Sequence, residues 1–332
     1  MDRKQKWALC LAAALLAAAV AVSLFIGKYP FSPAQVVDIL LGRVPPDDMS
    51  RKVFYTLRLS RTLMAALSGF GLAMAGSVYQ TIFKNPLADP DIIGVVKGAN
   101  LGAAVAIVAL GNQILPVAVS AFVGGLAAVL AVMALVRATR LGTTAVYVLS
   151  GIVVSAISEA LIMLLKFFAD PEKELAAIEF WSMGTFGGVT LSKLTAILPI
   201  FLVGLVGLLL LRRQIALLSV SEEESRALGV RVGAVRLGIL TLTTLMVASI
   251  ICITGRIAFL GLIAPHIARL VFRRNGFPTI LFSGLTGALI LTLADCAARS
   301  VYAVELPISV VTTVVGVPFL VYFMCRRKGA RL

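Results

Sequence analysis

Few side chains of this sequence could do chemistry, and most of them lie within long apolar segments. Glu159 and Lys166 are seven residues apart in one such segment, so they share a face if the segment is helical. An ionisable residue in this setting indicates a substrate pathway or a proton relay. The alternative is a pair that faces the interior of a helix bundle, with the Lys166 ammonium reaching the membrane surface. The segment ends just after Lys166, which favours this alternative.

Three more polar positions have a chemical and a structural interpretation. His266 is the one histidine of the chain and could relay protons or bind haem. A lone histidine in an apolar segment is more typical of a satisfied structural residue. Asp295 and Arg299 are four residues apart, which predicts a local ion pair at the end of a helix.

The sequence carries none of the common enzyme motifs. It has no G-x-x-x-x-G-K-[ST], no G-x-G-x-x-G, no HExxH and no G-x-S-x-G. The four cysteines stand singly, with neither a CxxC nor a Cys/His spacing for a metal. We therefore expect no catalytic residue, no metal site and no cofactor bound by this chain.

The composition indicates the class of protein. The 332 residues are 60% apolar and 14% charged, and the mean hydropathy is +1.00. Soluble domains are about 45–50% apolar and about 25% charged, so the composition excludes a soluble enzyme, a disordered chain and a nucleic-acid-binding domain. The net charge of +14 is then more typical of basic cytoplasmic loops than of nucleic-acid binding.

The apolar segments predict an all-α membrane protein of about ten transmembrane helices, with 1–332 as a single membrane domain. The first segment, 8–26, follows a basic start, but it is longer than the core of a signal peptide and long enough to span. Pro265 in the short segment 258–272 predicts a kink or a break. The other predicted spans are 62–83, 93–110, 114–136, 144–168, 192–211, 233–255, 279–298 and 307–325.

The Lys and Arg distribution predicts that both termini are cytoplasmic. With the N-terminus inside, eighteen basic residues fall in inside segments, among them Lys97, and eleven in outside segments, among them Arg256. This bias follows the positive-inside rule. The basic outer segment 43–61 is unusual, and Ser32-Pro33 in the same outer region predicts a capped short helix over 33–41.

Several motifs stand in a fixed order along the chain. They are Arg58-Leu-Ser-Arg61, Asn85-Pro86-Leu87-Ala88-Asp89-Pro90, Gly98-Ala99, Ala227-Leu228-Gly229, Gly261-Leu-Ile-Ala-Pro265-His266-Ile-Ala-Arg269, Asp295 with Arg299, and Glu305-Leu-Pro307 with Gly316-Val-Pro318. In this order and spacing they resemble the BtuC/FecCD-type permease subunits of bacterial ABC importers for iron–siderophores, haem and vitamin B12. The resemblance covers roughly residues 5–325.

The resemblance implies partner proteins in place of the missing motifs. A permease homodimer, or a pair of related permeases, would sit on two ATPase subunits that use ATP and Mg²⁺. A periplasmic or lipid-anchored substrate-binding protein would dock outside, on Arg58, Arg61 and Arg299, because guanidinium forks suit carboxylates. Exposed pairs of this kind contribute only about 0.2–1 kcal/mol each, so several are needed. The alternative for these arginines is contact with lipid headgroups.

The resemblance also implies roles for residues expected inside the cell. Residues 220–230 match the coupling helix that inserts into the ATPase, and Gly229 is expected to end that helix; the alternative is an ordinary amphipathic loop. The coupling residues are Glu222, Glu223, Arg226, Ala227, Leu228 and Gly229, and further family-motif or gate positions are Asn85, Pro86, Gly98, Pro265, His266 and Arg269.

The sequence departs from the family pattern at three places. Ser60 replaces a frequent proline and is expected to cap a helix. Lys97 replaces a small polar residue at the inner edge of a span, where it either extends to the surface or alters the inner gate. The acidic run Glu222-Glu223-Glu224 indicates an ATPase groove of different charge.

The function that follows is the permease subunit of an ATP-driven importer in the bacterial inner membrane. It would carry a metal chelate, a ferric siderophore or haem by family frequency and cobalamin as an option, along a dimer pathway lined by 144–168 and 307–325. The alternative is a secondary transporter driven by an ion gradient, which needs intramembrane carboxylates. Glu159 is then the one candidate, and the sequence offers no second acidic partner. A membrane enzyme or a channel is a more distant third.

Overall fold

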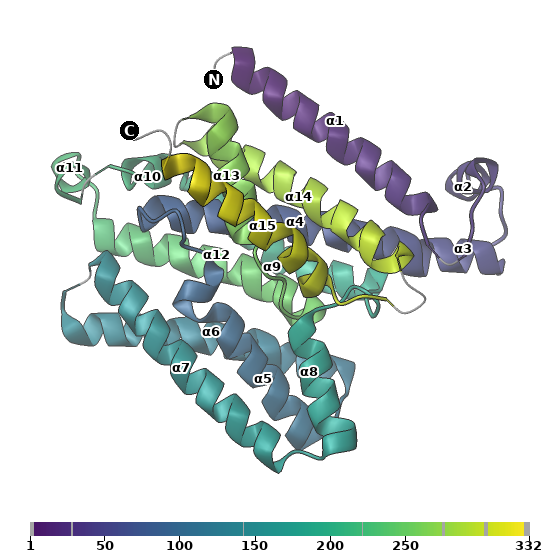
Figure 1. The fold of residues 1–332 in the computed structure, drawn as a ribbon, viewed down its shortest axis with the longest axis horizontal. Helices are drawn as coiled ribbons and strands as arrows, with labels where there is room; N and C mark the ends of the chain where they lie inside the picture. The colour runs from purple at the N-terminus through teal and green to yellow at the C-terminus, as the bar shows by residue number, and fades with distance from the viewer. Residues whose placement is uncertain are drawn as a thin grey trace.

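The computed structural model describes residues 3–27, 29–141, 143–220, 222–273, 276–301 and 305–328, and for 323–328 it describes the main chain alone. Within these ranges the chain forms helices and no strand (Figure 1). The helices are α1 (Arg3–Phe25), α2 (Pro33–Leu40), α3 (Met49–Val53), η1 (Phe54–Leu59), α4 (Ser60–Ile82), η2 (Pro90–Ile93), α5 (Val95–Leu110), α6 (Ile114–Thr139), α7 (Thr144–Phe168), η3 (Pro171–Leu175), α8 (Ala176–Met183), α9 (Leu191–Leu210), α10 (Arg212–Leu217), α11 (Glu222–Ala227), α12 (Val232–Thr254), α13 (Leu260–Phe272), α14 (Phe277–Ser300) and α15 (Ile308–Lys328).

Each of the ten predicted spans corresponds to a helix, so the all-α class is confirmed. Among the described residues, seven helices are long and apolar enough to cross a membrane, and α5, α13 and the apolar part of α15 are shorter. The second span begins earlier than predicted, because the helix runs without a break from Met49 through η1 into α4. Ser60 therefore lies inside a helix, its hydroxyl donates to the carbonyl of Thr56, and the expected cap at Ser60 is wrong.

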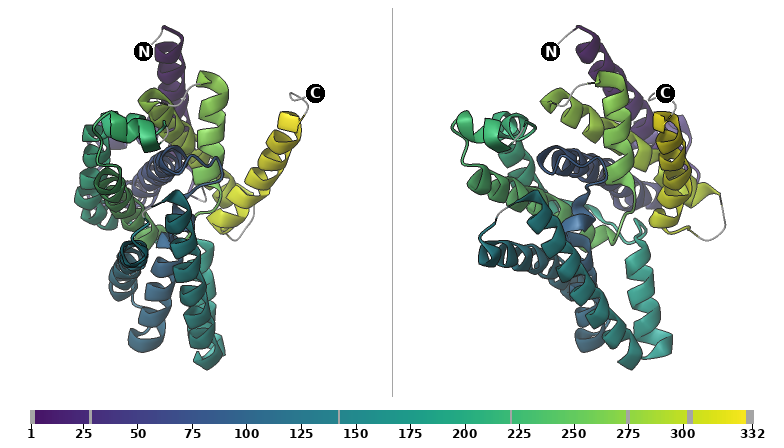
Figure 2. Two further views of the ribbon diagram at one scale, coloured as in Figure 1. Left: turned by 90° about the vertical axis from the view of Figure 1, so that its left-hand side faces the viewer. Right: turned by 60° about the vertical axis from the view of Figure 1, so that its left-hand side comes forward.

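Glycine lets α4 and α14 pack against each other in the middle of the bundle. A Cβ at Gly69 would overlap the main chain at Gly287, and a Cβ at Gly287 would overlap Ala73. The two main chains approach this closely because neither glycine has a side chain. Figures 1 and 2 show α4 surrounded by the other long helices.

Two connections enter the interior of the bundle. At 1.5 Å per residue, α5 (16 residues) and α13 (13 residues) are about 24 and about 20 Å long. Both are shorter than the roughly 30 Å of a hydrocarbon core, so 83–94 and 255–259 reach inward to complete the crossings. They meet around a cavity of about 90 Å³ that Asp89, Asp91, Arg256 and Phe259 help to line.

An ion pair joins the two connections. Arg256 of the second connection lies 3.4 Å from Asp91 of the first, between Nη2 and Oδ2. The sides of the membrane assigned to Arg256 and to Lys97, which lies in the first turn of α5, stay predictions.

The bundle has two distinct ends (Figure 1). The start of α1, the described end of α15 and the short helices α10 and α11 lie at one end, here termed the α11 end. At the other end, the arginine end, lie α2, α3, the last turn of α1 and the last turn of α14. The predicted capped helix is confirmed there as α2, with Ser32 and Gln35 in a capping box.

The α4–α14 contact can be tested with one methyl group. We expect Gly287→Ala to lower the melting temperature of the detergent-purified protein by about 2 to 10 °C, because overpacking costs about 1–3 kcal/mol. Gly233→Ala is the matched control, since a Cβ there meets nothing within 4 Å. An unchanged melting temperature for Gly287→Ala would show that the helices separate without penalty.

Candidate functional site

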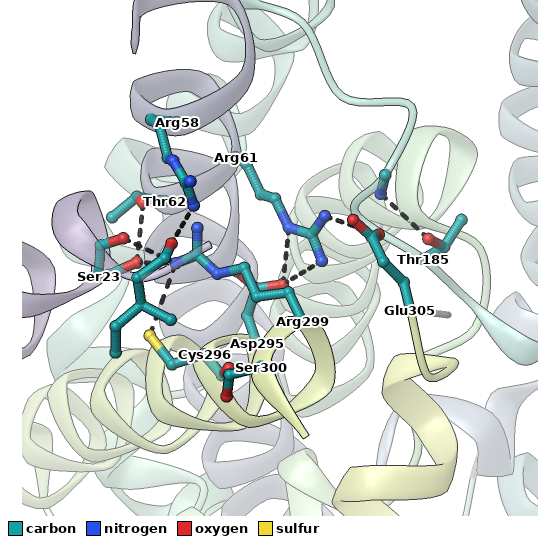
Figure 3. A network of polar contacts seen from close by, with 12 residues as sticks. Ser23, Arg58, Arg61, Thr62, Thr185, Asp295, Cys296, Arg299, Ser300 and Glu305 are labelled. Carbon is teal, nitrogen blue, oxygen red and sulfur yellow. Dashed lines mark hydrogen bonds and ion pairs between the residues drawn. The ribbon is translucent and has the colours of Figure 1, made fainter. Parts of the chain in front are cut away.

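Three arginines and two carboxylates gather at the arginine end (Figure 3). We term Arg58, Arg61, Arg299, Asp295 and Glu305 the arginine cluster. Arg58 lies in η1 and Arg61 in the first turn of α4. Asp295 and Arg299 lie in the last turns of α14. Glu305 lies between α14 and α15.

Arg61 is the link between the two helices. Its Nε and Nη2 each lie 2.9 Å from Asp295 Oδ1, and its Nη1 lies 2.8 Å from Glu305 Oε2. Arg299 approaches the other oxygen of the Asp295 carboxylate at 3.4 Å. The predicted local pair of Asp295 and Arg299 is therefore confirmed, and it is part of a larger network.

Arg58 and Arg299 also contact α1 and the residues that follow it. Arg58 donates to the carbonyls of Ile26 and Tyr29, and Arg299 donates to the carbonyl of Ser23 at 2.9 Å. These carbonyls lack a hydrogen-bond partner within a helix, because α1 ends here. Hydrogen bonds thus join the end of α1 and the residues after it to η1, through Arg58, and to α14, through Arg299.

The three arginines are not exposed, which corrects one premise of the docking prediction. Arg58, Arg61 and Arg299 are only 6, 8 and 5% exposed. A buried guanidinium requires partners inside the protein, and each arginine has them. The docking role itself stays a prediction.

A second group of charges gathers where the two inward-reaching connections meet α5 and α7, and we term it the interior charge cluster. On its open side, the side chains of Arg256 and Glu159 are 39 and 49% exposed. It comprises Asp89, Asp91, Lys97, Glu159 and Arg256. Lys97 of α5 forms an ion pair with Glu159 of α7, and Arg256 pairs with Asp91. The cluster joins both inward-reaching connections to α5 and α7.

The interior charge cluster corrects two predictions from the sequence. Glu159 and Lys166 do not pair with each other, because Lys166 binds Glu179 of α8 at 2.7 Å. Lys97 does not stand alone, since it forms an ion pair with Glu159, and its own side chain is 21% exposed. The sequence also offered no acidic partner for Glu159, yet Asp91 is near enough for the two carboxylates to repel each other.

Asp89 shapes the first inward connection. Its carboxylate accepts from the main-chain N–H of Asp91 at 3.0 Å, which closes the first turn of η2.

The remaining motif positions have structural contacts. Nδ1 of His266 lies 2.7 Å from the carbonyl of Leu262, and Arg269 lies 3.3 Å from the same nitrogen. Asn85 accepts from the main-chain N–H of Leu87 and begins the turn that contains Pro86. A Cβ at Gly98 would overlap Ala128 and Gly124 of α6, so Gly98 permits the α5–α6 contact. Pro265 lies inside α13, which remains one helix.

At the α11 end, a short helix stands at the position predicted for coupling. It is α11, and Gly229 follows it with a φ of +79°, so the predicted helix and its end are confirmed. Ser221, part of the predicted segment, lies outside the described residues. Glu223, Arg226, Ala227, Leu228 and Gly229 are exposed. Their role in coupling stays a prediction.

Glu222 differs from the rest of the acidic run. It forms an ion pair with Arg236 of α12, which is fully buried and also lies over the ring of Tyr147 at 5.5 Å. The hydroxyl of Ser225 donates to the carbonyl of Leu217 at 2.8 Å. These contacts fix α11 on α10 and α12, and an open groove of about 700 Å³ lies beside it, bordered by Arg213, Arg231 and Gly229.

Sequence reasoning missed the contacts that join distant segments. Arg61 and Asp295 are 234 positions apart, and Lys97 and Glu159 are 62 apart. One usable signal was present: an unpaired Lys97 and an unpaired Glu159, both in apolar segments, each required a partner.

The fold and the paired charges inside it define a polytopic, all-helical membrane protein. The chain belongs to the FecCD transport family, whose pattern matches residues 15–326.

Individual relatives and a solved structure agree with this assignment. The chain is 38% identical to the "Probable iron chelatin transport system permease protein" of Helicobacter pylori, over 83% of each chain. It is 34% identical to the molybdate import system permease protein MolB of Haemophilus influenzae, over 94% of each. An inward-facing conformation of a metal-chelate type ABC transporter superposes with a TM-score of 0.85 at 33% identity, covering 96% of this chain and 98% of that one. The predicted BtuC-like permease fold is confirmed.

Proposed function

We propose that this chain is the permease subunit of an ATP-driven importer in a bacterial inner membrane, with both termini cytoplasmic. Residues 1–332 act as one permease domain that binds no ATP and changes no bond. Two separate ATPase subunits use ATP and Mg²⁺, and the permease works as a homodimer or with a related permease. A periplasmic or lipid-anchored binding protein delivers the cargo. Membership of the FecCD transport family supports this assignment.

The observation that carries the proposal is that the same two helices reach both candidate docking ends. At the arginine end, α4 and α14 bear Arg61 and Asp295. Toward the α11 end, both helices contact α10. A movement of α10 and α11 imposed by an ATPase therefore acts directly on the helices that hold the arginine cluster.

The exposure of Glu159 supports a pathway along α7. Its side chain is 49% exposed in the single chain, although it lies in the middle of a spanning helix. Contact of a carboxylate with lipid at this depth is costly. We infer that this side of α7 faces water or a second permease, as a dimer pathway beside α7 and α15 requires.

The cargo we propose is a metal chelate, with a ferric siderophore or haem ahead of cobalamin. The Helicobacter pylori relative, named for iron chelatin, supports iron. The relative named for molybdate is similar over a larger share of the chain, so the family accommodates more than one cargo. A competition assay with ferric siderophore, haem, cobalamin and molybdate distinguishes these cargoes.

The interior charge cluster favours a second candidate, a transporter driven by an ion gradient. Asp89 and Asp91 supply the acidic groups that such a mechanism needs. Against it, Asp91 pairs with Arg256 and Glu159 pairs with Lys97. A paired carboxylate binds a coupling cation weakly, because the ammonium or guanidinium already neutralises it.

The deciding experiment is purification of the chain from its native membrane, followed by uptake in proteoliposomes. If the chain is an importer permease, an ATPase with a Walker motif should co-purify in equal amount. Uptake should then require ATP on the side of the proteoliposome membrane where the ATPase lies. A chain that purifies alone, with uptake that follows a proton gradient and ignores ATP, supports the gradient-driven alternative instead.

Leu228 provides a test of the coupling surface. Its side chain is 61% exposed beside the groove at the α11 end, and we expect Leu228→Asp to reduce ATP-dependent uptake at least tenfold, because an apolar contact of about 1.5–3 kcal/mol is lost. Binding-protein docking should be unaffected. The matched control is Leu141→Asp, a change at an equally exposed leucine between α6 and α7. Equal losses in both variants would remove the assignment of α11 as the coupling helix.

A further inference from the structure

Arg61 divides its guanidinium between two carboxylates that differ in exposure. Nε and Nη2 face Asp295, which is completely buried. Nη1 faces Glu305, whose side chain is 37% exposed. Figure 3 shows Glu305 and Asp295 on different sides of the Arg61 fork. Solvent therefore reaches Arg61 from the side that Glu305 occupies.

Glu305 stands at the start of the connection into α15. The next residue, Leu306, donates to the carbonyl of Ala298 at 3.0 Å, and Ile308 donates to that of Gly184 at 3.1 Å. Ser309 donates to the carbonyl of Arg256 at 2.7 Å. These contacts join the start of α15 to the rest of the bundle.

Beyond its first turn, α15 packs on the bundle along one face only. Thr312 is 3% exposed and a Cβ at Gly316 would overlap Ile263 of α13, whereas Val314 and Val315 are 66 and 60% exposed. Residues 305–309 therefore hold the start of a helix that the single chain covers on one side. The Arg61–Glu305 pair is the one ion pair among the contacts described for that stretch.

The other two arginines have no partly exposed carboxylate partner that an incoming carboxylate could replace. Arg58 is satisfied by main-chain carbonyls, and Arg299 by Ser23 and the buried Asp295. An incoming carboxylate would have to displace uncharged main-chain acceptors at Arg58, and Ser23 or the fully buried Asp295 at Arg299. At Arg61 it would replace one carboxylate by another, which leaves the charge of the guanidinium compensated throughout.

We propose that Glu305 pairs with Arg61 in the free permease, and that an acidic side chain of the docked binding protein displaces Glu305 and takes its place on the guanidinium. Displacement releases the start of α15, so docking at the arginine end is transmitted to a helix of the proposed pathway. This inference rests on the proposed function, because it assumes a binding protein. It reconciles the burial of Arg61 with docking, since the site is occupied from within until the partner arrives.

The test is the affinity of the binding protein for the importer complex reconstituted in nanodiscs. The probe is the substrate-binding protein that co-purifies with the complex from the native membrane. We expect Glu305→Gln to lower its Kd about two- to fivefold, because docking no longer breaks an ion pair of partly exposed groups. The Kd should also rise more steeply with salt, since docking then forms an ion pair without breaking one.

Two variants control the measurement. Glu305→Asp keeps a carboxylate and should return the Kd toward that of the unmodified complex, whereas a structural defect would not be repaired in this way. Glu179→Gln removes another half-exposed carboxylate, paired with Lys166, and should leave the Kd unchanged. Hydrogen exchange at 308–315 should increase on docking, and in Glu305→Gln it should be high before docking.

The results separate this inference from the proposed function. If the unmodified complex binds the protein and Glu305→Gln has an equal or higher Kd, the exchange at Arg61 is wrong and the importer stands. If no ATPase and no binding protein associate with the unmodified chain, the proposed function and the exchange fail together.

Discussion

The contact of Arg61 with Asp295 joins the two central helices of the bundle. A cation beside a fully buried carboxylate offsets much of the cost of its burial, and Asp295 has two guanidiniums beside it. The pair lies at the end of the α4–α14 contact, whose glycines bring the main chains close together. Close packing and charge pairing therefore reinforce each other, and the end of α1 is fastened to the same arginine cluster.

The same physical rule organises the interior of the protein. Helices α5 and α13 are too short to cross a membrane, so their connections bring Asp89, Asp91 and Arg256 inside. Each charge that enters an apolar bundle needs a counter-charge or a proton. Arg256 is the counter-charge of Asp91.

The two charge clusters differ in what can reach them. The arginine cluster opens to one side through Glu305, at an end where a soluble partner could approach. The interior charge cluster opens through Glu159 toward the side of α7 that this chain leaves uncovered. The importer that we propose takes cargo from a partner and passes it between two permeases, and it needs both kinds of opening.

The sequence by itself determined the number and the approximate limits of the spanning helices, the cap of α2 and the end of α11 at Gly229. These features depend on segment length and on residues a few positions apart, so local patterns predict them. Burial of Arg58, Arg61 and Arg299, and the partners of Lys97, Glu159 and Lys166, were decided only by the tertiary structure. Such pairs join helices far apart in the chain, and their formation depends on which helix faces pack together. No periodicity within one segment carries that information.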